Sequence, residues 1–210
     1  MTTIYLIRHA QSVSNLSGRF MGQFNVPLSE QGKAQLIDLA EHFREIHLDA
    51  LYASPLMRAR DTAIAAGSNQ GLTPILRPRL MEICGGVWEN TTWDDIKAKH
   101  AEEYRLWKEE PWNFRAEGGE SMREVYDRVA AEMTCIAEEN EGKTVAVASH
   151  GCAIRNFMCY AYGIGIEAMN SLPFFANAGV CRLSWERDGG FRVLEAPADV
   201  CYDPSAKQDK

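Results

Sequence analysis

Several patterns that would define a protein class are missing from this sequence. The 210 residues contain no internal repeat, no low-complexity segment, no Cys-x-x-Cys spacing and no apolar run of membrane-spanning length. Without such a run, and with a strand pattern that begins near the N-terminus, we expect no membrane partner and a cytoplasmic location. The cysteines show no paired-cysteine motif, and several of them lie inside apolar stretches. We therefore predict free, buried thiols in a reducing compartment. The six cysteines are Cys84, Cys135, Cys152, Cys159, Cys181 and Cys201.

Positive charge is also in short supply. The sequence has 22 Lys and Arg against 29 Asp and Glu, which gives a formal net charge of −7. A broad basic face is what nucleic-acid binding requires, so we expect no nucleic-acid partner. If the protein handles an anion, its positive charge must be concentrated in one pocket.

The apolar content is high enough for one good core. Hydrophobic residues make up 46% of the sequence, so we expect a single domain over residues 1–203, followed by a flexible tail at 204–210. Strand patterns alternate with helix patterns, and this alternation predicts an α/β fold: a three-layer α/β/α sandwich with a mostly parallel central sheet. Ser54 and Pro55 fit the N-cap and first position of a helix. The parallel strands are expected at 3–8, 50–54, 73–80 and 144–151, helices at 29–46, 56–67, 118–143 and after 151, and an antiparallel pair at 180–187 and 191–197.

Polar and charged side chains follow three of the expected parallel strands. In open α/β sheets ligands bind beyond the carboxyl ends of the strands, so these side chains and the N-termini of the following helices should meet at one edge. A single His there is more often structural, and a single Arg more often a solvated charge. Their coincidence at one edge favours a site, and the planar fork of arginine suits a phosphoryl group. The residues concerned are Arg8, His9, Arg58, His150 and Gly151.

Four stretches of the sequence resemble the motifs of the histidine phosphatase superfamily, also called phosphoglycerate mutase-like. "LIRHAQSVSN", followed by "GRFMGQFNVPLSEQGKAQ", is similar to its first signature: Arg-His-Gly/Ala, an Asn six residues after the His, and a later Pro-Leu-Ser/Thr-x-x-Gly. "YASPLMRARDTA", "LMEICGGVWEN" and "VAVASHGCAIR" resemble the next three motifs, in order, from Thr3 to about Asn177. Asn90 replaces the last Gly of Gly-x-Trp-Glu-Gly, and Ala10 the Gly of the triplet, which puts only local loop shape in doubt.

The resemblance implies a role for each matching residue. His9 would be the nucleophile that becomes a phosphohistidine, and Glu82 the general acid. Arg8, Asn15, Arg58, His150 and Gly151 would bind the phosphoryl group. Neighbouring arginines disfavour protonation of a histidine, which keeps its lone pair available. We therefore expect a metal-independent phosphomonoesterase that hydrolyses a small phosphorylated metabolite without a cofactor.

Other functions remain open from the sequence. Phosphoglycerate mutase-type transfer would need an arginine pair for the substrate carboxylate, and the segment after the third motif offers only Arg105 and Arg115, so "GGVWEN" favours the phosphatase branch. A metal-dependent hydrolase lacks a paired-His motif, and the arginines would repel a dication. A non-catalytic module that binds phosphorylated ligands would be expected to lack His9 or Glu82. The physiological substrate and the oligomeric state, including a homodimer, are not determined by the sequence.

A segment at 84–118 is expected to form an inserted helical lid rich in aromatic side chains. These aromatics would either select apolar or ring-containing phosphomonoesters or simply anchor the lid to the sheet. Glu120 and Ser121, just beyond the segment, resemble a Gly-Glu-Ser that is common in phosphatase branches of the family. A capping box of Ser121 with Glu124, at the start of a helix that we expect to stop at Gly142, explains Ser121, so neither residue is counted as catalytic. The aromatic residues are Trp93, Tyr104, Trp107, Trp112 and Phe114.

Overall fold

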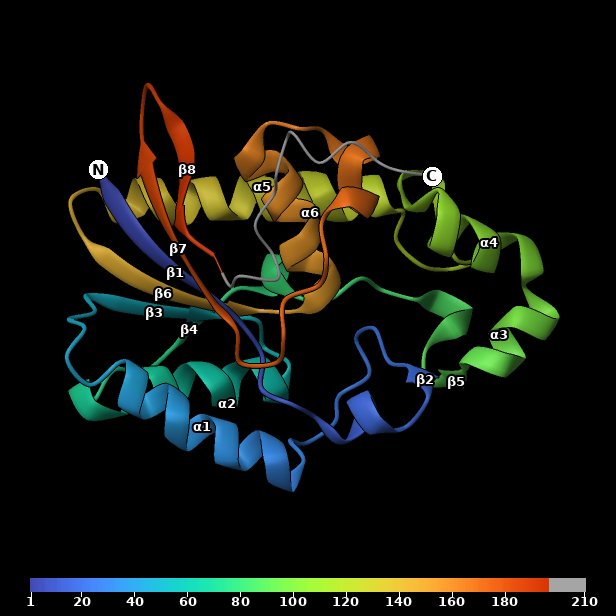
Figure 1. Ribbon diagram of the computed structural model, residues 1–210, viewed down its shortest axis with the longest axis horizontal. Coiled ribbons are helices and arrows are strands. Elements are labelled where there is room, and N and C mark those ends of the chain that lie inside the picture. The colour runs from blue at the N-terminus through green and yellow to red at the C-terminus, as the bar shows by residue number, and fades with distance from the viewer. Residues whose placement is uncertain (197–210) are drawn as a thin grey trace.

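A six-stranded sheet with helices on both faces forms the centre of the molecule (Figure 1). The computed structural model describes residues 1–196. The strand order is β4-β3-β6-β1-β7-β8; the first four strands are parallel, β7 runs antiparallel to β1, and β8 runs antiparallel to β7. The predicted three-layer α/β/α sandwich with a mostly parallel sheet is therefore confirmed. These strands are β1 (Thr2–Arg8), β3 (Ala50–Ala53), β4 (Ile75–Leu76), β6 (Thr144–Ser149), β7 (Val180–Glu186) and β8 (Gly190–Glu195).

Each face of the sheet has its own apolar core. Ile4 and Leu6 of β1 pack with the pair α5 and α6, whereas Ile7 packs with the pair α1 and α2. Successive side chains of a strand point to opposite faces, so a strand buried on both faces needs an apolar residue at nearly every position. This explains the continuous apolar runs of β1 and β6. The four helices are α1 (Glu30–His42), α2 (Met57–Ala66), α5 (Met122–Glu139) and α6 (Gly151–Tyr162).

Several expected element boundaries are wrong, and two of them have a clear physical reason. The strand expected to reach residue 80 ends at Leu76, because Pro78 has no N–H to donate to the ladder and begins a 3₁₀ turn instead. Helix α2 begins at Met57, with Leu56 as its N-cap, so Ser54 and Pro55 lie before it. The hydroxyl of Ser54 lies 2.7 Å from Nε2 of His150, which gives this serine a partner other than a helix end.

The expected start of the long helix α5 is confirmed. Ser121 Oγ accepts the N–H of Glu124 at 3.2 Å, and Glu124 Oε2 accepts the N–H of Ser121 at 2.8 Å. This reciprocal capping box fixes where α5 begins. The helix ends with Asn140 as its C-cap, just before the expected stop at Gly142.

The aromatic segment at 84–118 forms a small lobe at one end of the sheet (Figure 1). Trp88 and Phe114 are completely buried there, and Phe20 of β2 packs edge-on against Trp88 with ring centroids 5.5 Å apart. Much of the aromatic surface therefore anchors the lobe. Its elements are β5 (Thr91–Thr92), which pairs with β2 (Arg19–Phe20), and helices α3 (Trp93–Lys99) and α4 (Ala101–Glu109).

Short 3₁₀ turns and free thiols complete the described chain. Cys152, Cys159 and Cys181 are buried, and Cys84 and Cys135 are half-buried; Cys84, Cys135, Cys152 and Cys159 are free thiols. The sixth cysteine, the expected domain end at 203 and the expected tail at 204–210 lie outside the described residues. None of the helices within residues 1–196 is both long and apolar enough to cross a bilayer. The 3₁₀ turns are η1 (Val13–Leu16), η2 (Ser68–Gln70), η3 (Pro78–Leu80), η4 (Gly86–Trp88), η5 (Pro111–Asn113) and η6 (Ile166–Ser171).

Candidate active site

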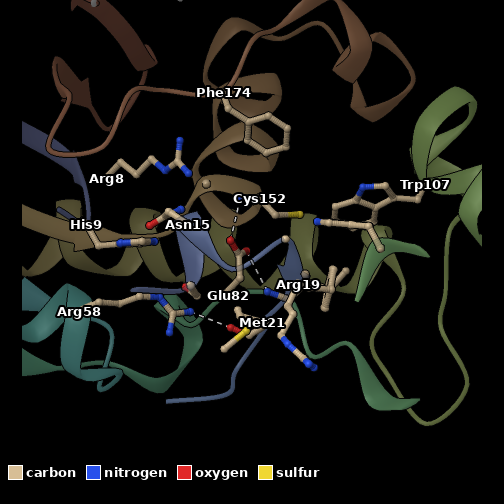
Figure 2. A pocket seen from close by; sticks show the side chains of 17 residues that line it. Arg8, His9, Asn15, Arg19, Met21, Arg58, Glu82, Trp107, Cys152 and Phe174 are labelled. Atoms are coloured by element: carbon tan, nitrogen blue, oxygen red, sulfur yellow. Dashed lines mark hydrogen bonds between the residues drawn. The ribbon is translucent and has the colours of Figure 1, made fainter. Parts of the chain in front are cut away.

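The carboxyl ends of β3, β6 and β1 lie side by side, and the sequence-predicted residues meet beyond them. Arg8 pairs in register with Ser149, and Ala53 with Ala148, so the three strands end at one level. A cavity of about 290 Å³ opens there (Figure 2). Its lining includes six of the seven predicted residues: Arg8, His9, Asn15, Arg58, Glu82 and Gly151. The seventh, His150, is fully buried beside it, with its ring centroid 5.1 Å from that of His9.

His9 is held in one tautomer. Its Nδ1 lies 2.8 Å from the carbonyl oxygen of Ala10, and a carbonyl can only accept, so Nδ1 carries the ring proton and Nε2 keeps the lone pair. Burial lowers the pKa of His9 well below its usual value, with further lowering by the charges of Arg58 and Arg8 and an opposing effect of the Ala10 hydrogen bond. The ring is therefore neutral near pH 7, with Nε2 free to act as a nucleophile or acceptor.

Two buried arginines stand beside this ring. The guanidinium of Arg58 donates to the carbonyls of Gly22 at 2.7 Å and Phe24 at 3.0 Å, and Arg8 donates through Nη1 to the carbonyl of Phe175. Burial lowers the pKa of both side chains. No carboxylate within residues 1–196 forms an ion pair with either arginine.

Two buried side-chain nitrogens at this site form no hydrogen bond with the described residues. Nε of Arg8 and Nδ1 of His150 lack a hydrogen-bond partner among the described residues. Leaving such groups unpaired in a buried site costs free energy, which an oxyanion placed between them would recover. The site is therefore organised for an anion. Burial, together with the charges of Arg58 and of the neighbouring His9 ring, also lowers the pKa of His150 well below its usual value.

The carboxylate of Glu82 occupies the N-terminus of α6. Its Oε2 accepts the N–H of Cys152 at 3.0 Å, while Oε1 accepts those of Ala153 at 3.1 Å and Ile83 at 3.0 Å. These three N–H groups orient the carboxyl group of Glu82 at the cavity wall. The N–H of Met57 at the start of α2 donates to Asn25. Three N–H groups of these helix N-termini, those of Cys152, Ala153 and Met57, are therefore already used by side chains of the protein.

The loop that carries Glu82 is held by two residues that the sequence interpretation left out. Glu120, which lies just before α5, and Arg128 of α5 form a bidentate ion pair with N–O distances of 2.7 and 2.9 Å. Arg128 also donates to the carbonyl of Glu82 itself at 3.0 Å, and Glu120 accepts the N–H of Cys84 at 2.8 Å. Both sides of Glu82 are thus fixed to α5. The resemblance of Glu120 and Ser121 to the Gly-Glu-Ser of phosphatase branches is the sequence signal that points to Glu120, whereas no comparable signal marks Arg128.

A second carboxylate orients Arg58 indirectly. Glu89 accepts the N–H groups of Gln23 at 3.0 Å and Phe24 at 2.9 Å, and so fixes the loop whose carbonyls receive the Arg58 guanidinium. The next residue, Asn90, has φ of 54°, in the left-handed region. Asparagine tolerates this conformation better than most residues, so the replacement of the motif glycine leaves the loop shape intact.

The Pro-Leu-Ser-x-x-Gly motif supports the chain immediately after His9. The N–H of Ser29 donates to the carbonyl of Gln11 at 3.0 Å, and Ser29 Oγ accepts the N–H of Gly32 at 3.0 Å. Thr62 of α2 accepts the N–H of Ala10 at 2.9 Å. The main chain at Ala10 and Gln11, immediately after His9, is therefore fixed by α2 and by the start of α1.

Apolar side chains also line the cavity. Trp93 and Trp107 from the aromatic lobe line it, together with Phe174. In Figure 2, Phe174, Cys152 and Trp107 border the cavity on the side away from Arg58. Arg19 stands at the mouth, where it donates to the carbonyl of Asn90 at 2.6 Å. Within residues 1–196, no cluster of three or more His, Cys, Asp or Glu side chains could hold a metal ion.

Known proteins share both this sequence pattern and this fold. The profile of the histidine phosphatase superfamily (branch 1) matches residues 4–196. Phosphoserine phosphatase 1 of Hydrogenobacter thermophilus is 35% identical over 167 residues, which cover 80% of this chain and 79% of that protein. The structure of YhfR from Bacillus stearothermophilus superposes with a TM-score of 0.89 at 26% identity, covering 96% of this chain and 99% of YhfR. A mycobacterial glucosyl-3-phosphoglycerate phosphatase in complex with VO3 gives a TM-score of 0.82 at 27% identity, covering 92% and 98% of the two chains.

Proposed function

Because the chain belongs to the histidine phosphatase superfamily, we propose that it is a metal-independent phosphomonoesterase that works through a phosphohistidine on His9. The single observation that carries the proposal is the state of this ring: neutral, with its proton on Nδ1 and its lone pair on Nε2 beside two buried arginines. A nucleophilic histidine needs this tautomer, and a phosphoryl group needs the neighbouring charge.

The phosphoryl group binds between the arginines and His150. Arg8 and Arg58 neutralise its oxygens, and the unpaired Nε of Arg8 and Nδ1 of His150 find their missing partners there. The side-chain oxygen Oδ1 of Asn15 accepts the N–H of Ser12 at 2.9 Å. The side-chain NH₂ group of Asn15 can therefore donate to a phosphoryl oxygen. Gly151 completes the wall beside Arg8. This arrangement supplies the positioning and charge stabilisation on which phosphoryl transfer depends.

In the first chemical step, Nε2 of His9 attacks phosphorus and the bond from phosphorus to the ester oxygen breaks. The departing oxygen takes a proton from Glu82, so the alcohol leaves neutral and His9 carries the phosphoryl group. The proton belongs on Oε2, because Oε1 accepts two backbone N–H groups and Oε2 only one. General-acid help of this kind is worth roughly 10²–10⁴-fold in rate.

In the second step, water attacks the phosphohistidine. The carboxylate of Glu82 takes a proton from the water as the new phosphorus–oxygen bond forms and the phosphorus–nitrogen bond breaks. Inorganic phosphate leaves, and His9 and protonated Glu82 return to their starting states. No step calls for a metal or a cofactor, because Arg8 and Arg58 supply the positive charge.

The substrate is a small phosphorylated metabolite. A cavity of about 290 Å³ accommodates a compact molecule rather than a folded partner. The names of the similar phosphatases, which specify phosphoserine and glucosyl-3-phosphoglycerate, support this class. The segment 84–118 acts as a lid whose Trp93 and Trp107 face the substrate, while Trp88 and Phe114 anchor it.

The test compares phenyl phosphate hydrolysis by the wild type, by His9→Ala and by His47→Ala, which removes an exposed histidine outside the cavity. We expect only His9→Ala to lose activity. Rapid quenching in alkaline detergent should preserve a phosphohistidine on the wild type, which is stable to base, lost on acid treatment and detected by mass spectrometry. Equal rates for wild type and His9→Ala would refute the proposal. Adding bisphosphoglycerate with a phosphoglycerate substrate tests for transfer, because only mutase-type chemistry interconverts the two monophosphates.

A further inference from the structure

A second cavity of about 190 Å³ borders the candidate active site. The two cavities share three lining residues, Trp107, Cys152 and Phe174, so these side chains lie at the boundary between them. Figure 2 shows the same three residues at the edge of the first cavity. A ligand that fills the first cavity can therefore extend toward the second past this partition. The second cavity also contains two basic residues, Lys108 and Arg155, which the proposed chemistry does not use.

Arg155 is a half-buried cation without a counter-ion. It lies three residues after Cys152 on α6, so both side chains share one face of the helix. Its Nε donates to the carbonyl of Leu172 at 2.6 Å, and its Cζ stacks 4.7 Å from the ring centroid of Phe174. No carboxylate within residues 1–196 forms an ion pair with it. Burial lowers the pKa of its guanidinium, with the thiols of Cys152 and Cys159 acting in the opposite direction.

The guanidinium of Arg155 is held in place by its hydrogen bonds, but several of its N–H groups have no described acceptor. Besides the bond to Leu172, Nη2 makes one long contact of 3.4 Å to Asn170 Oδ1. A guanidinium has five N–H donors, so several remain available to the cavity. Keeping a partly buried charge without an opposite charge is unfavourable, and an arginine in this state is matched by an oxyanion.

The second cation, Lys108, approaches from the lid. It is exposed on α4, and no ion pair joins it to a described carboxylate. The acids that lie nearest in the chain, Glu109 and Glu110, are bound instead to Arg105, at 3.4 and 2.6 Å. The second cavity thus has a cation on each side, one from α6 and one from the lid.

We propose that the second cavity binds a second anionic group of the substrate, a carboxylate or a phosphate, held by Arg155 and Lys108. The proposal rests on the proposed phosphatase function of the first cavity. Arg155 follows Gly151 by four residues, or about 6 Å along the helix axis. The preferred phosphomonoesters therefore carry their second negative charge about one helical turn from the phosphoryl group, with the apolar body of the molecule against Trp107 and Phe174.

Matched aryl phosphates test this directly. Para-carboxyphenyl phosphate and para-carbamoylphenyl phosphate have nearly the same shape, but only the first has a charge across the ring from the phosphoryl group. We expect the wild type to hydrolyse the carboxylate with a kcat/KM about ten- to hundredfold higher, the range for a charge-assisted hydrogen bond. Para-phenylene bisphosphate identifies the preferred anion: its kcat/KM above or below that of the carboxylate assigns the subsite to phosphate or to carboxylate.

Arg155→Gln should remove most of this preference, and Arg155→Lys should retain part of it. The matched control is Arg187→Gln, which deletes an exposed arginine of the β7–β8 hairpin and should leave the ratio at its wild-type value. If Arg155→Gln does not fold, Lys108→Gln decides, because this exposed side chain has no hydrogen bond or ion pair to another side chain within residues 1–196; we expect it to lower the ratio two- to fivefold. A wild type that hydrolyses both compounds equally, or a ratio unaffected by both substitutions, overturns the proposal.

The outcomes also separate this inference from the proposed function. Turnover of phenyl phosphate that depends on His9 but shows no preference for the carboxylate refutes the anion subsite alone. Absence of His9-dependent turnover for every compound refutes the phosphatase mechanism, and the subsite with it.

Discussion

Nδ1 of His9 lies 2.8 Å from the carbonyl oxygen of Ala10, the next residue in the chain. This contact is local, but it decides which ring nitrogen can attack phosphorus. The neighbouring arginines and burial then keep the ring neutral, although the Ala10 bond alone would favour the protonated form. The same short segment, Arg8-His9-Ala10, therefore supplies the proposed nucleophile, its orientation and one of the cations that maintain its state.

The protonation of His9 should follow from this arrangement. Its pKa in the folded protein is well below the usual 6.5, so the ring should stay neutral as the pH falls through 6.5 and become protonated only at much lower pH. The unfolded chain takes up this proton near pH 6.5, so the contribution of His9 to folding stability is full above that pH and is lost as the pH falls toward the folded pKa. NMR titration of the His9 ring signal, assigned with His9→Ala, measures the midpoint. A midpoint at or above 6.5 would contradict the electrostatic argument.

Replacement of Glu82 by glutamine should slow hydrolysis in a way that depends on the leaving group. Glutamine cannot donate a proton in the same manner, so for an alkyl phosphate, whose departing alkoxide is strongly basic, kcat should fall by about 10²–10⁴-fold. For an ester of an acidic phenol the first step needs no proton, so the loss should be much smaller. Steady-state kinetics over a series of leaving groups measures this dependence.

The same variant has a second signature. Water attack on the phosphohistidine loses its base, so with an acidic phenol the phosphoenzyme should accumulate and product should appear in a burst. Glu89→Gln serves as a control. It removes a nearby carboxylate that binds the loop at residues 22–24, and this carboxylate donates no proton to the substrate. Equal losses for all leaving groups in Glu82→Gln would show that Glu82 does not act as the acid.

Much of the fold could be predicted from the sequence, because it depends on local signals. Apolar runs with charged ends marked β1 and β6, and Ser121 with Glu124 marked the start of α5. The convergence of Arg8, His9, Arg58 and His150 followed from one topological rule, since parallel neighbours end at the same edge. The short β4 was predictable in principle from Pro78, but the apolar residues before it favoured a longer strand.

The supporting residues were not predictable in the same way. Arg128 acts through carbonyl groups of a loop far away in the sequence, and such acceptors are present at every residue, so no side-chain pattern identifies them. Arg155 was also indistinguishable from any surface arginine of α6. Only the structure shows that it enters a cavity and has no ion-pair partner within residues 1–196.

Arg128 should act as a positioning residue for Glu82. Its guanidinium, half-buried at 15% exposure, ties the carbonyls of Met81 and Glu82 to α5, so Arg128→Gln should let the carboxylate move and lower kcat roughly tenfold or more. The loss should be greatest for poor leaving groups, as for Glu82→Gln. In the double variant with Glu82→Gln, the substitution should cost little further activity, because the group that it positions is already gone.

The control for that cycle is Arg123→Gln on the same helix, which breaks an exposed ion pair to Glu167 at 2.8 Å. Exposed pairs of this kind contribute little, so kcat and stability should stay close to the wild type. If Arg128→Gln and Glu82→Gln instead reduce activity multiplicatively, Arg128 acts on the reaction by a route other than Glu82.

Gly32→Ala should destabilise the fold at the base of the site. A Cβ at this position would lie 1.9 Å from the carbonyl oxygen of Gln11, a main-chain atom that cannot move without displacing the segment after His9. We expect the free energy of unfolding to fall by about 1–3 kcal/mol, with a parallel loss of kcat/KM, since relief of the clash shifts His9 relative to Arg58. Urea denaturation provides the measurement, and Lys33→Ala, an exposed neighbour on α1, provides the comparison. Equal stability of the two variants would mean that α1 can withdraw from Gln11 at no cost, and that the glycine of the motif does not fix the chain behind the nucleophile.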